Sequence, residues 1–509
     1  MVRLLTGSAV CAFAIVYGAP ASAQSASQSQ TGSAQTDPTA QNVPSGGGTK
    51  APEAKSSAYP GEAEGYGATT GGYNISRWAE DWTKYKDPAK RDDFIDSLKY
   101  IPITDDVYVT LSGEIRARVN FTSNPGLVET DAQRLDILRV VAGADLHLGD
   151  HVRVFGELAN GTVDGINTGA VAGTQRNDLF AQQIFADIYG KVGNVDVGVR
   201  GGRQEFTDGI SLLVSARDNN ALMFTLDGVR AWAKGSKLRA DVFDFNFVNY
   251  GTEGIRDDRT DGDTRFSGIS LGVVLPKTLF GGSKLFFDPL LWRLRSREQT
   301  WGGVTGREER IYYGGRLWGT IGPLTVDYTV TREEGDFAGR PIKAWQVFAA
   351  QTYRLGKGTS APRIGLRGDY GSGGDAFDPT KPLRTSFSPF GNNIYYTYGV
   401  FVGPINFLAA APNLSFQPIK KVRVTAEYEF MWRSTDRDAV YRSNGTPYSG
   451  TENVAGHEIG RAARLQAVWT IAPRLSFTGR LEHVKAGDVL TRAGYRSSNF
   501  GAGWISFRF

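Results

Sequence analysis

Apolar and polar residues alternate one by one along several long segments after Asp106. In 107–121 the odd-numbered positions are apolar or glycine, while the even-numbered positions are mostly polar or charged. The segments 324–331 and 421–433 repeat this alternation. A period of two is that of a β-strand with one apolar face and one polar face. The pattern therefore predicts an all-β protein with unusually long strands.

The length of these segments separates two all-β architectures. Strands of a soluble sandwich, the alternative interpretation, usually have about 5–6 residues, whereas a tilted strand that crosses a bilayer needs about 9–11. At roughly 22 residues per strand and connection, the segment 106–509 predicts a transmembrane antiparallel β-barrel of about 18 strands. The connections also alternate in length, as in outer-membrane barrels: short ones at 149–150, 192–194, 235–236 and 472–473 interleave with long ones at 160–178, 250–264, 300–306, 371–393 and 434–456.

The part of the chain before the barrel divides into three segments. Residues 1–23 are typical of a signal peptide that is cleaved after Ala21-Ser22-Ala23. Residues 24–74 are rich in Ser, Gln and Gly, a composition that predicts a disordered tail. Residues 75–105 carry aromatic residues near helical spacing and predict a short helical segment in the periplasm.

Composition excludes several other classes of protein. With 63 Gly, 28 Phe, 21 Tyr and 10 Trp, the chain is too aromatic for a disordered protein and too rich in glycine for a helical one. The single cysteine, Cys11, lies in the predicted signal peptide, so the mature chain has no disulfide. The formal net charge of +4 is near balance and indicates no nucleic-acid partner.

The C-terminal segment carries the usual recognition signal of the barrel assembly machinery. Residues 501, 503, 505, 507 and 509 are Gly, Gly, Ile, Phe and Phe on one strand face, and the chain stops at Phe509. Together with the signal peptide, this predicts a protein of the outer membrane of a Gram-negative bacterium, with outer-membrane lipid and the assembly machinery as partners. We expect a monomer. Tryptophans expected in the membrane girdle are Trp292, Trp318, Trp345, Trp432 and Trp469.

The polar strand face predicts the chemistry of the lumen. If the apolar face meets lipid, the polar face lines a water-filled interior. On this face Arg293, Arg295 and Arg297 form a column that alternates with Trp292, Leu294 and Ser296. Further lumen arginines are Arg116, Arg118, Arg139, Arg367, Arg423, Arg433 and Arg464. Arginine stays charged and matches carboxylates, so the set predicts an anion-selective pore. The alternative is that these arginines pair with inward carboxylates and brace the wall.

Several motifs, in this order, resemble the alginate export proteins of Gram-negative outer membranes. They include WAEDW, LKYIPI, LSGEIRARVNF, GRQEF, LDGVRAW, FMWRSTDRDAVY and HVKAGDVL, the last beginning at His483. The resemblance implies an 18-stranded barrel that passively passes an anionic polyuronate through a constricted, electropositive pore. The matching motif positions are Arg116, Arg118, Arg203, Glu205, Arg217, Asp218, Asp227, Arg230 and Arg433. The chain departs from the family pattern at Leu226, where Phe is usual, and in the tail before Ile75.

The favoured function is a channel for anionic saccharides, such as alginate-like polyuronates or oligouronates, or for related organic acids. No enzymatic activity, cofactor or bound metal is expected. Three alternatives stay open: a general or other-substrate porin, a barrel-embedded hydrolase using His483 with Ser476 or Ser506, and a structural barrel plugged by its loops. A Ca²⁺ site in the loop with Asp257, Asp258, Asp261 and Asp263 is less favoured than solvated loop charge.

Overall fold

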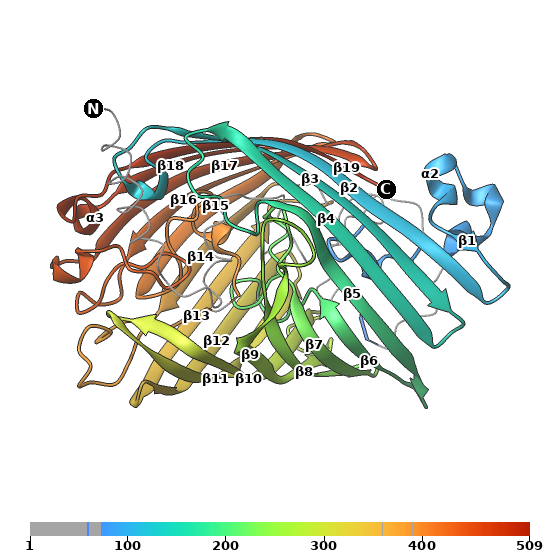
Figure 1. Cartoon of the computed structure of the whole chain (residues 1–509), viewed down its shortest axis with the longest axis horizontal. Coiled ribbons are helices and arrows are strands. Elements are labelled where there is room, and N and C mark those ends of the chain that lie inside the picture. The colour runs from blue at the N-terminus through green and yellow to red at the C-terminus, as the bar shows by residue number, and fades with distance from the viewer. Residues whose placement is uncertain (1–58, 61–72, 359, 389) are drawn as a thin grey trace.

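The chain forms a closed barrel of antiparallel strands (Figure 1). The computed structural model describes residues 59–60, 73–358, 360–388 and 390–509. Each strand from β2 to β19 pairs with the next along the chain, and β19 pairs with β2 to close a ring of 18 strands. This confirms the predicted architecture. The strands are β2 (Val107–Thr122), β3 (Gln133–Leu148), β4 (Val152–Ile166), β5 (Asn177–Val192), β6 (Val195–Gln204), β7 (Leu226–Lys234), β8 (Leu238–Asn249), β9 (Arg259–Val274), β10 (Lys284–Trp301), β11 (Val304–Ile321), β12 (Leu324–Phe337), β13 (Arg340–Arg354), β14 (Arg363–Gly371), β15 (Phe407–Ile419), β16 (Val422–Trp432), β17 (Glu458–Ala472), β18 (Leu475–Ala486) and β19 (Ser498–Arg508).

The outer face of the barrel is apolar over most of its height. Ile188, Leu481 and Val229, from three different strands, are 68%, 61% and 53% exposed. Exposed aliphatic residues recur in this way on nearly every strand, at alternate positions. Such a surface is unsuited to water but matches the hydrocarbon of a bilayer. The closed ring also leaves no strand edge with unpaired backbone groups, as a bilayer requires.

The connections are mostly short at one end of the barrel and mostly long at the other. Connections of two or three residues at the first end include 149–151, 193–194 and 322–323, whereas 205–225, 372–406 and 433–457 lie at the second. Several predicted boundaries are wrong. Strand β4 continues to Ile166, strand β9 already begins at Arg259, and the expected loop at 371–393 extends to 406. The expected loop at 300–306 is a tight hairpin turn at Gly302-Gly303. Both of these glycines have positive φ, 56° and 81°, as a two-residue type I′ turn requires.

The segment before the barrel is built from short helical turns. It contains the 3₁₀ turns η4 (Arg77–Ala79), η5 (Thr83–Lys86) and η6 (Pro88–Lys90), the helix α2 (Phe94–Ser97) and the two-residue strand β1 (Ile101–Pro102). Helix α2 and the later helix α3 (Asp488–Arg492) lie at opposite ends of the barrel (Figure 1).

None of the described helices is long and apolar enough to cross a membrane. The predicted signal peptide, 1–23, and nearly all of the predicted tail, 24–74, lie outside the described residues.

The lumen contains a hydrophobic core that the sequence did not predict. The connections 205–225 and 372–406 leave the wall from the short strands β6 and β14, which have 10 and 9 residues, and are largely buried. They meet where Val214 bridges Phe390, whose ring packs against Phe247 and Phe266 of the wall. A side chain at Gly391 would place its Cβ 1.9 Å from the Leu212 carbonyl oxygen, so the crossing requires glycine. The barrel is therefore filled in part by its own loops.

This core reverses the predicted orientation of β10. Trp292 and Leu294 are 2% and 3% exposed and belong to the core inside the barrel. Arg293, Arg295 and Arg297 consequently point outward, and the side chain of Arg297 is 75% exposed. The prediction that the three arginines line the lumen is wrong, because apolar loops replace water behind this strand. Trp318 also faces inward and packs on Phe286, not in the girdle, whereas Trp345 and Trp469 are exposed on the outer face.

The seam between the first and last barrel strands depends on a glycine. Gly113 of β2 exchanges two backbone hydrogen bonds with Phe509, at 2.8 and 3.1 Å. A Cβ on Gly113 would lie 2.5 Å from the Phe509 ring and 2.8 Å from the Val141 carbonyl oxygen. The seam therefore has no room for a side chain at residue 113.

We predict that Gly113→Ala lowers the free energy of unfolding by about 1–3 kcal/mol, the usual cost of overpacking. The measurement is a urea titration of the barrel in lipid bilayers, followed by heat-modifiable migration on gels. Gly201→Ala is the matched control, because a Cβ there has nothing within 4 Å. Equal midpoints for the two variants would contradict the role of Gly113.

Candidate functional site: the charged lumen of the barrel

The first group of charges in the lumen surrounds Glu114 of β2. Its carboxylate lies 2.7 Å from Arg116, 3.5 Å from Arg139 and 2.5 Å from Arg77. Glu114 is fully buried, and Arg116 and Arg139 are nearly so. A buried charge without a partner costs several kcal/mol, about 3–5 when one member of a pair is removed. The group therefore behaves as one structural unit.

Asp218 connects this group to the loop 205–225. Its carboxylate lies 3.1 Å from Arg116 and 2.8 Å from Arg139. Burial alone would raise the pKa of Asp218, but the two guanidinium groups outweigh burial and lower its pKa to about 2. A carboxylate with a lowered pKa stabilises the fold above its ordinary pKa and loses this contribution only as the pH falls toward the lowered value. The loop thus stays anchored at neutral and mildly acidic pH.

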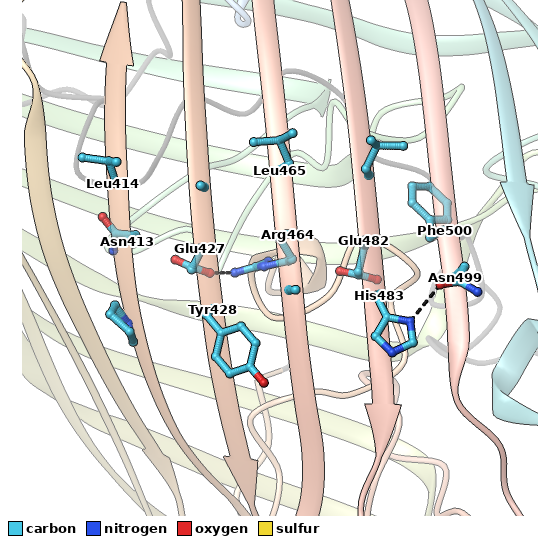
Figure 2. Close-up of a pocket in the computed structure, with 14 residues that line it drawn as sticks. Asn413, Leu414, Glu427, Tyr428, Arg464, Leu465, Glu482, His483, Asn499 and Phe500 are labelled. Carbon is cyan, nitrogen blue, oxygen red and sulfur yellow. Dashed lines mark hydrogen bonds and ion pairs between the residues drawn. The ribbon is translucent and has the colours of Figure 1, made fainter.

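A second group of charges lies on the opposite side of the seam, on β14 and β16 to β18. Arg367 lies 2.9 Å from Asp369, 2.8 Å from Glu427 and 3.1 Å from Glu429. Figure 2 shows Arg464 between Glu427 and Glu482, one residue from each of three neighbouring strands, and Arg464 is paired with Glu427.

Glu482 in turn holds the loop 372–406 in the lumen. It accepts backbone hydrogen bonds from Tyr398 and Gly399. Each of these two inward loops, 205–225 and 372–406, is therefore fixed to the wall through a buried carboxylate, Asp218 for the first and Glu482 for the second.

Between the two charged groups, arginines and aromatic rings gather on β2, β18 and β19. The guanidinium groups of Arg118 and Arg480 lie 4.6 and 5.1 Å from the centroid of the Trp504 ring. Arg480 also lies 4.6 Å from the Tyr398 ring. Arg118 donates to Asn120, and Arg480 donates to Gln466, each at 2.6 Å. Guanidinium groups therefore lie against aromatic faces in this part of the lumen.

The segment before the barrel inserts two side chains into the lumen. Arg77 reaches Glu114 and Glu157, the latter at 2.9 Å. Trp78 donates from its indole nitrogen to Glu205 at 2.8 Å, and burial raises the pKa of Glu205 to about 7. Because Glu205 begins the loop 205–225, the N-terminal segment and an inward loop meet inside the barrel. Sequence reasoning missed this contact, and the only signal for it was the WAEDW motif that Trp78 begins.

A cavity of about 700 Å³ lies beside Trp78, at the end of the barrel with the short turns. Its lining includes Trp232 and the cations Arg153, Arg200, Arg230 and Lys234. Asp187 pairs with Arg200 at 2.7 Å and also with Arg153. Arg200 lies 3.8 Å from the Trp78 ring centroid. Aromatic faces and guanidinium groups together suit a ring-shaped anion.

The remaining predicted site residues lie apart from these groups. Arg423 faces the lumen near Ser415, at 3.3 Å. Arg433 donates to carbonyl oxygens of the loop 433–457, including those of Asp438 and Thr451, and so organises that loop. Arg203 and Asp227 form a two-pronged ion pair at 2.8 and 3.0 Å, on the strand face of the exposed Val199 and Val229. Of the predicted residues, the structure brings Arg116 and Arg139 together around Glu114, and Arg367 and Arg464 together around Glu427. Arg118 lies between these groups, beside Trp504.

The residues of the hydrolase alternative are separated. Figure 2 shows the contact of His483 with Asn499. It measures 2.8 Å and lies on the outer face, the face of the exposed Leu481. Ser506 donates to Glu114 inside the lumen, at 2.6 Å. Within the described part of the chain, no group of three or more His, Cys, Asp or Glu side chains is arranged to hold a metal ion. In the loop considered for Ca²⁺, the Asp257 carboxylate instead accepts from two backbone amides.

The closed ring, the apolar outer face and the charged interior define an outer-membrane β-barrel of the channel type. The chain belongs to the alginate export family, whose model matches residues 107–503. No curated protein sequence matches the chain.

Solved structures of outer-membrane porins share the fold at low sequence identity. OpdQ of Pseudomonas aeruginosa has a TM-score of 0.53 at 11% identity, covering 80% of this chain and 99% of its own. OccAB1 of Acinetobacter baumannii has a TM-score of 0.52 at 12% identity, covering 81% and 99%. OccK2 of P. aeruginosa, solved in complex with glucuronate, has a TM-score of 0.50 at 11% identity, covering 79% and 98%.

We predict that the double variant Arg77→Ala, Trp78→Ala increases single-channel conductance in planar bilayers. The two side chains occupy the lumen, so their removal widens the path at this level. Lys86→Ala, an exposed position of the same segment, is the control and should leave conductance unchanged. If the double variant conducts like the unmodified protein, the narrowest part of the lumen lies elsewhere.

Proposed function

We propose that this protein is a diffusion channel for anionic saccharides, such as polyuronates or oligouronates, or for related organic acids. The observation that carries the proposal is the pair of guanidinium groups beside Trp504 and Tyr398, contributed by Arg118 and Arg480. A uronate residue offers a carboxylate for the planar guanidinium fork and a ring face for the aromatic side chains. Membership of the alginate export family supports the same class of substrate.

The pairing of most lumen charges limits the number of arginines that meet the substrate. Arg116, Arg139 and Arg367 each pair with buried carboxylates that anchor loops or join strands. These residues brace the wall and set the positions of their neighbours. Selectivity then depends on few groups, whose charges act strongly because the low-dielectric walls of a narrow site focus their field.

The cavity beside Trp78 is the proposed entrance on the side of the short turns. It combines Trp232 with Arg153, Arg200 and Arg230, the same residue types as the arginine and aromatic group farther up the lumen. The related fold of OccK2 has been solved with glucuronate, an acidic sugar. A substrate that meets two such places in succession exchanges one set of contacts for another as it moves, which favours passage over retention.

We expect Arg118→Gln combined with Arg480→Gln to lower the chloride-to-potassium permeability ratio by about twofold or more, because two positive charges leave a narrow site. Reversal potentials across a KCl gradient give this ratio. Arg297→Gln is the control, because it removes an arginine from the outer face and leaves the charge of the lumen unchanged. A cation-preferring channel, or equal ratios in the two variants, would contradict the proposal.

We further expect acidic sugars to enter proteoliposomes faster than neutral sugars of the same size. Glucuronate and glucose differ little in volume, so a higher flux of glucuronate reports the charge of the lumen. Liposome swelling measures both rates in one preparation. A general porin, the competing function, would pass the two sugars at similar rates, and would do so in the Arg118→Gln, Arg480→Gln variant as well.

A further inference from the structure

The outward-facing arginines of β10 belong to a charged surface that spans several strands. We define the outer arginine patch as Arg265, Arg293, Arg295, Arg297 and Arg332. Their closest carboxylates belong to residues on β8, β9, β11 and β12: Asp244, Asp263, Glu309 and Glu334. None of these residues takes part in the lumen groups described above.

The register of the sheet places this patch at the edge of the lipid-facing surface. Val242, Ile269, Leu291, Tyr313 and Trp345 lie in one row across β8 to β13, interrupted only by Arg332. All five are 41–52% exposed. The next row toward the long loops contains Arg293, and the row after that contains Arg295 and Arg265. Aromatic residues at the boundary followed by cations are typical of a membrane interface.

The arrangement of the patch brings like charges together. Arg295 and Arg265 are direct partners across β10 and β9. Like charges directly opposite on neighbouring strands destabilise a sheet. Glu309 is shared, because it lies 2.5 Å from Arg293 and 3.8 Å from Arg295. Within the described residues, no group accepts a hydrogen bond from the Arg295 guanidinium, and Arg297 has only Asp263, at 3.2 Å. An anion placed here would relieve this repulsion.

From these observations we infer that the outer arginine patch binds the phosphate groups of a phosphorylated glycolipid, lipid A, in the outer leaflet. Guanidinium groups match phosphate oxygens in a bidentate manner. Basic side chains at the headgroup level are the usual receptors for anionic lipids. The apolar row around Leu291 would contact the acyl chains of the same molecule. The position at the lipid boundary favours a lipid headgroup over a free anion, which could bind equally well in the loops.

The experiment uses the full protein in nanodiscs that contain either bisphosphorylated lipid A or lipid A from which the phosphates have been removed. Native mass spectrometry counts the lipid A molecules retained. The unmodified protein should retain several times more of the phosphorylated form. Arg293→Gln with Arg295→Gln and Arg297→Gln should abolish this preference. A triple variant of exposed loop arginines, Arg384→Gln with Arg437→Gln and Arg496→Gln, is the matched control and should keep it.

Two further measurements, one with a Glu309 variant and one with inorganic phosphate, test which group binds the anion and where the anion comes from. Glu309→Gln removes the carboxylate that competes for Arg293 and Arg295, and should increase retention of phosphorylated lipid A. Millimolar inorganic phosphate tests the source of the anion, and should not displace the lipid. Equal retention of the two lipids, or no change in the Glu309 variant, would overturn the assignment. Displacement by inorganic phosphate would overturn the lipid headgroup as the ligand. The patch faces away from the lumen, so failure here leaves the channel proposal unaffected.

Discussion

The constraint on which the structure depends is that every backbone hydrogen-bonding group in the membrane needs a partner within the protein. The pairing of β19 with β2 meets this requirement for the whole ring, and Gly113 allows the final residue, Phe509, to reach its place. Once the ring is closed, each strand has one face toward lipid and one toward the lumen. The outer aliphatic surface and the inner network of charges follow from that division.

Inside the ring, desolvation decides how arginine is used. Arg116 and Arg139 are buried with Glu114 and Asp218, and Arg367 is buried with Glu429 and also pairs with Glu427. A buried ion pair adds little net stability against an apolar substitute, but removal of one partner is costly. The networks therefore fix where the loops lie more than they stabilise the barrel. They also leave the group around Trp504 in a defined place within the lumen.

The strand pattern was predictable because it depends on local alternation, as in 107–121, and the strand number followed from length. The inward placement of Arg116, Arg118 and Arg139 also followed from alternation. Their partner Asp218 could not be predicted, since it lies 102 residues from Arg116 in a connection whose path depends on tertiary packing.

The alternation of apolar and polar residues gave the wrong orientation for Arg293. It shows that a strand has an apolar face and a polar face, but it does not show whether water or apolar loops fill the lumen. Where apolar loops fill it, Trp292 turns inward and the arginines turn outward. The glycines at 302 and 303 similarly make a tight turn where a loop was expected.

The contacts of the N-terminal segment relate the two ends of the chain to each other. Arg508, at the end of β19, donates to the carbonyl oxygen of Asn74, a residue 434 positions earlier. Arg474, in the turn before β18, bonds to the hydroxyl of Tyr73 and pairs with Asp96. The partners of Asn74, Tyr73 and Asp96 are thus supplied by the end of β19 and by the turn before β18, which follow this segment in the chain. The segment before the barrel can therefore take its final place only after these strands have formed, so its seating reports that this side of the barrel is in place.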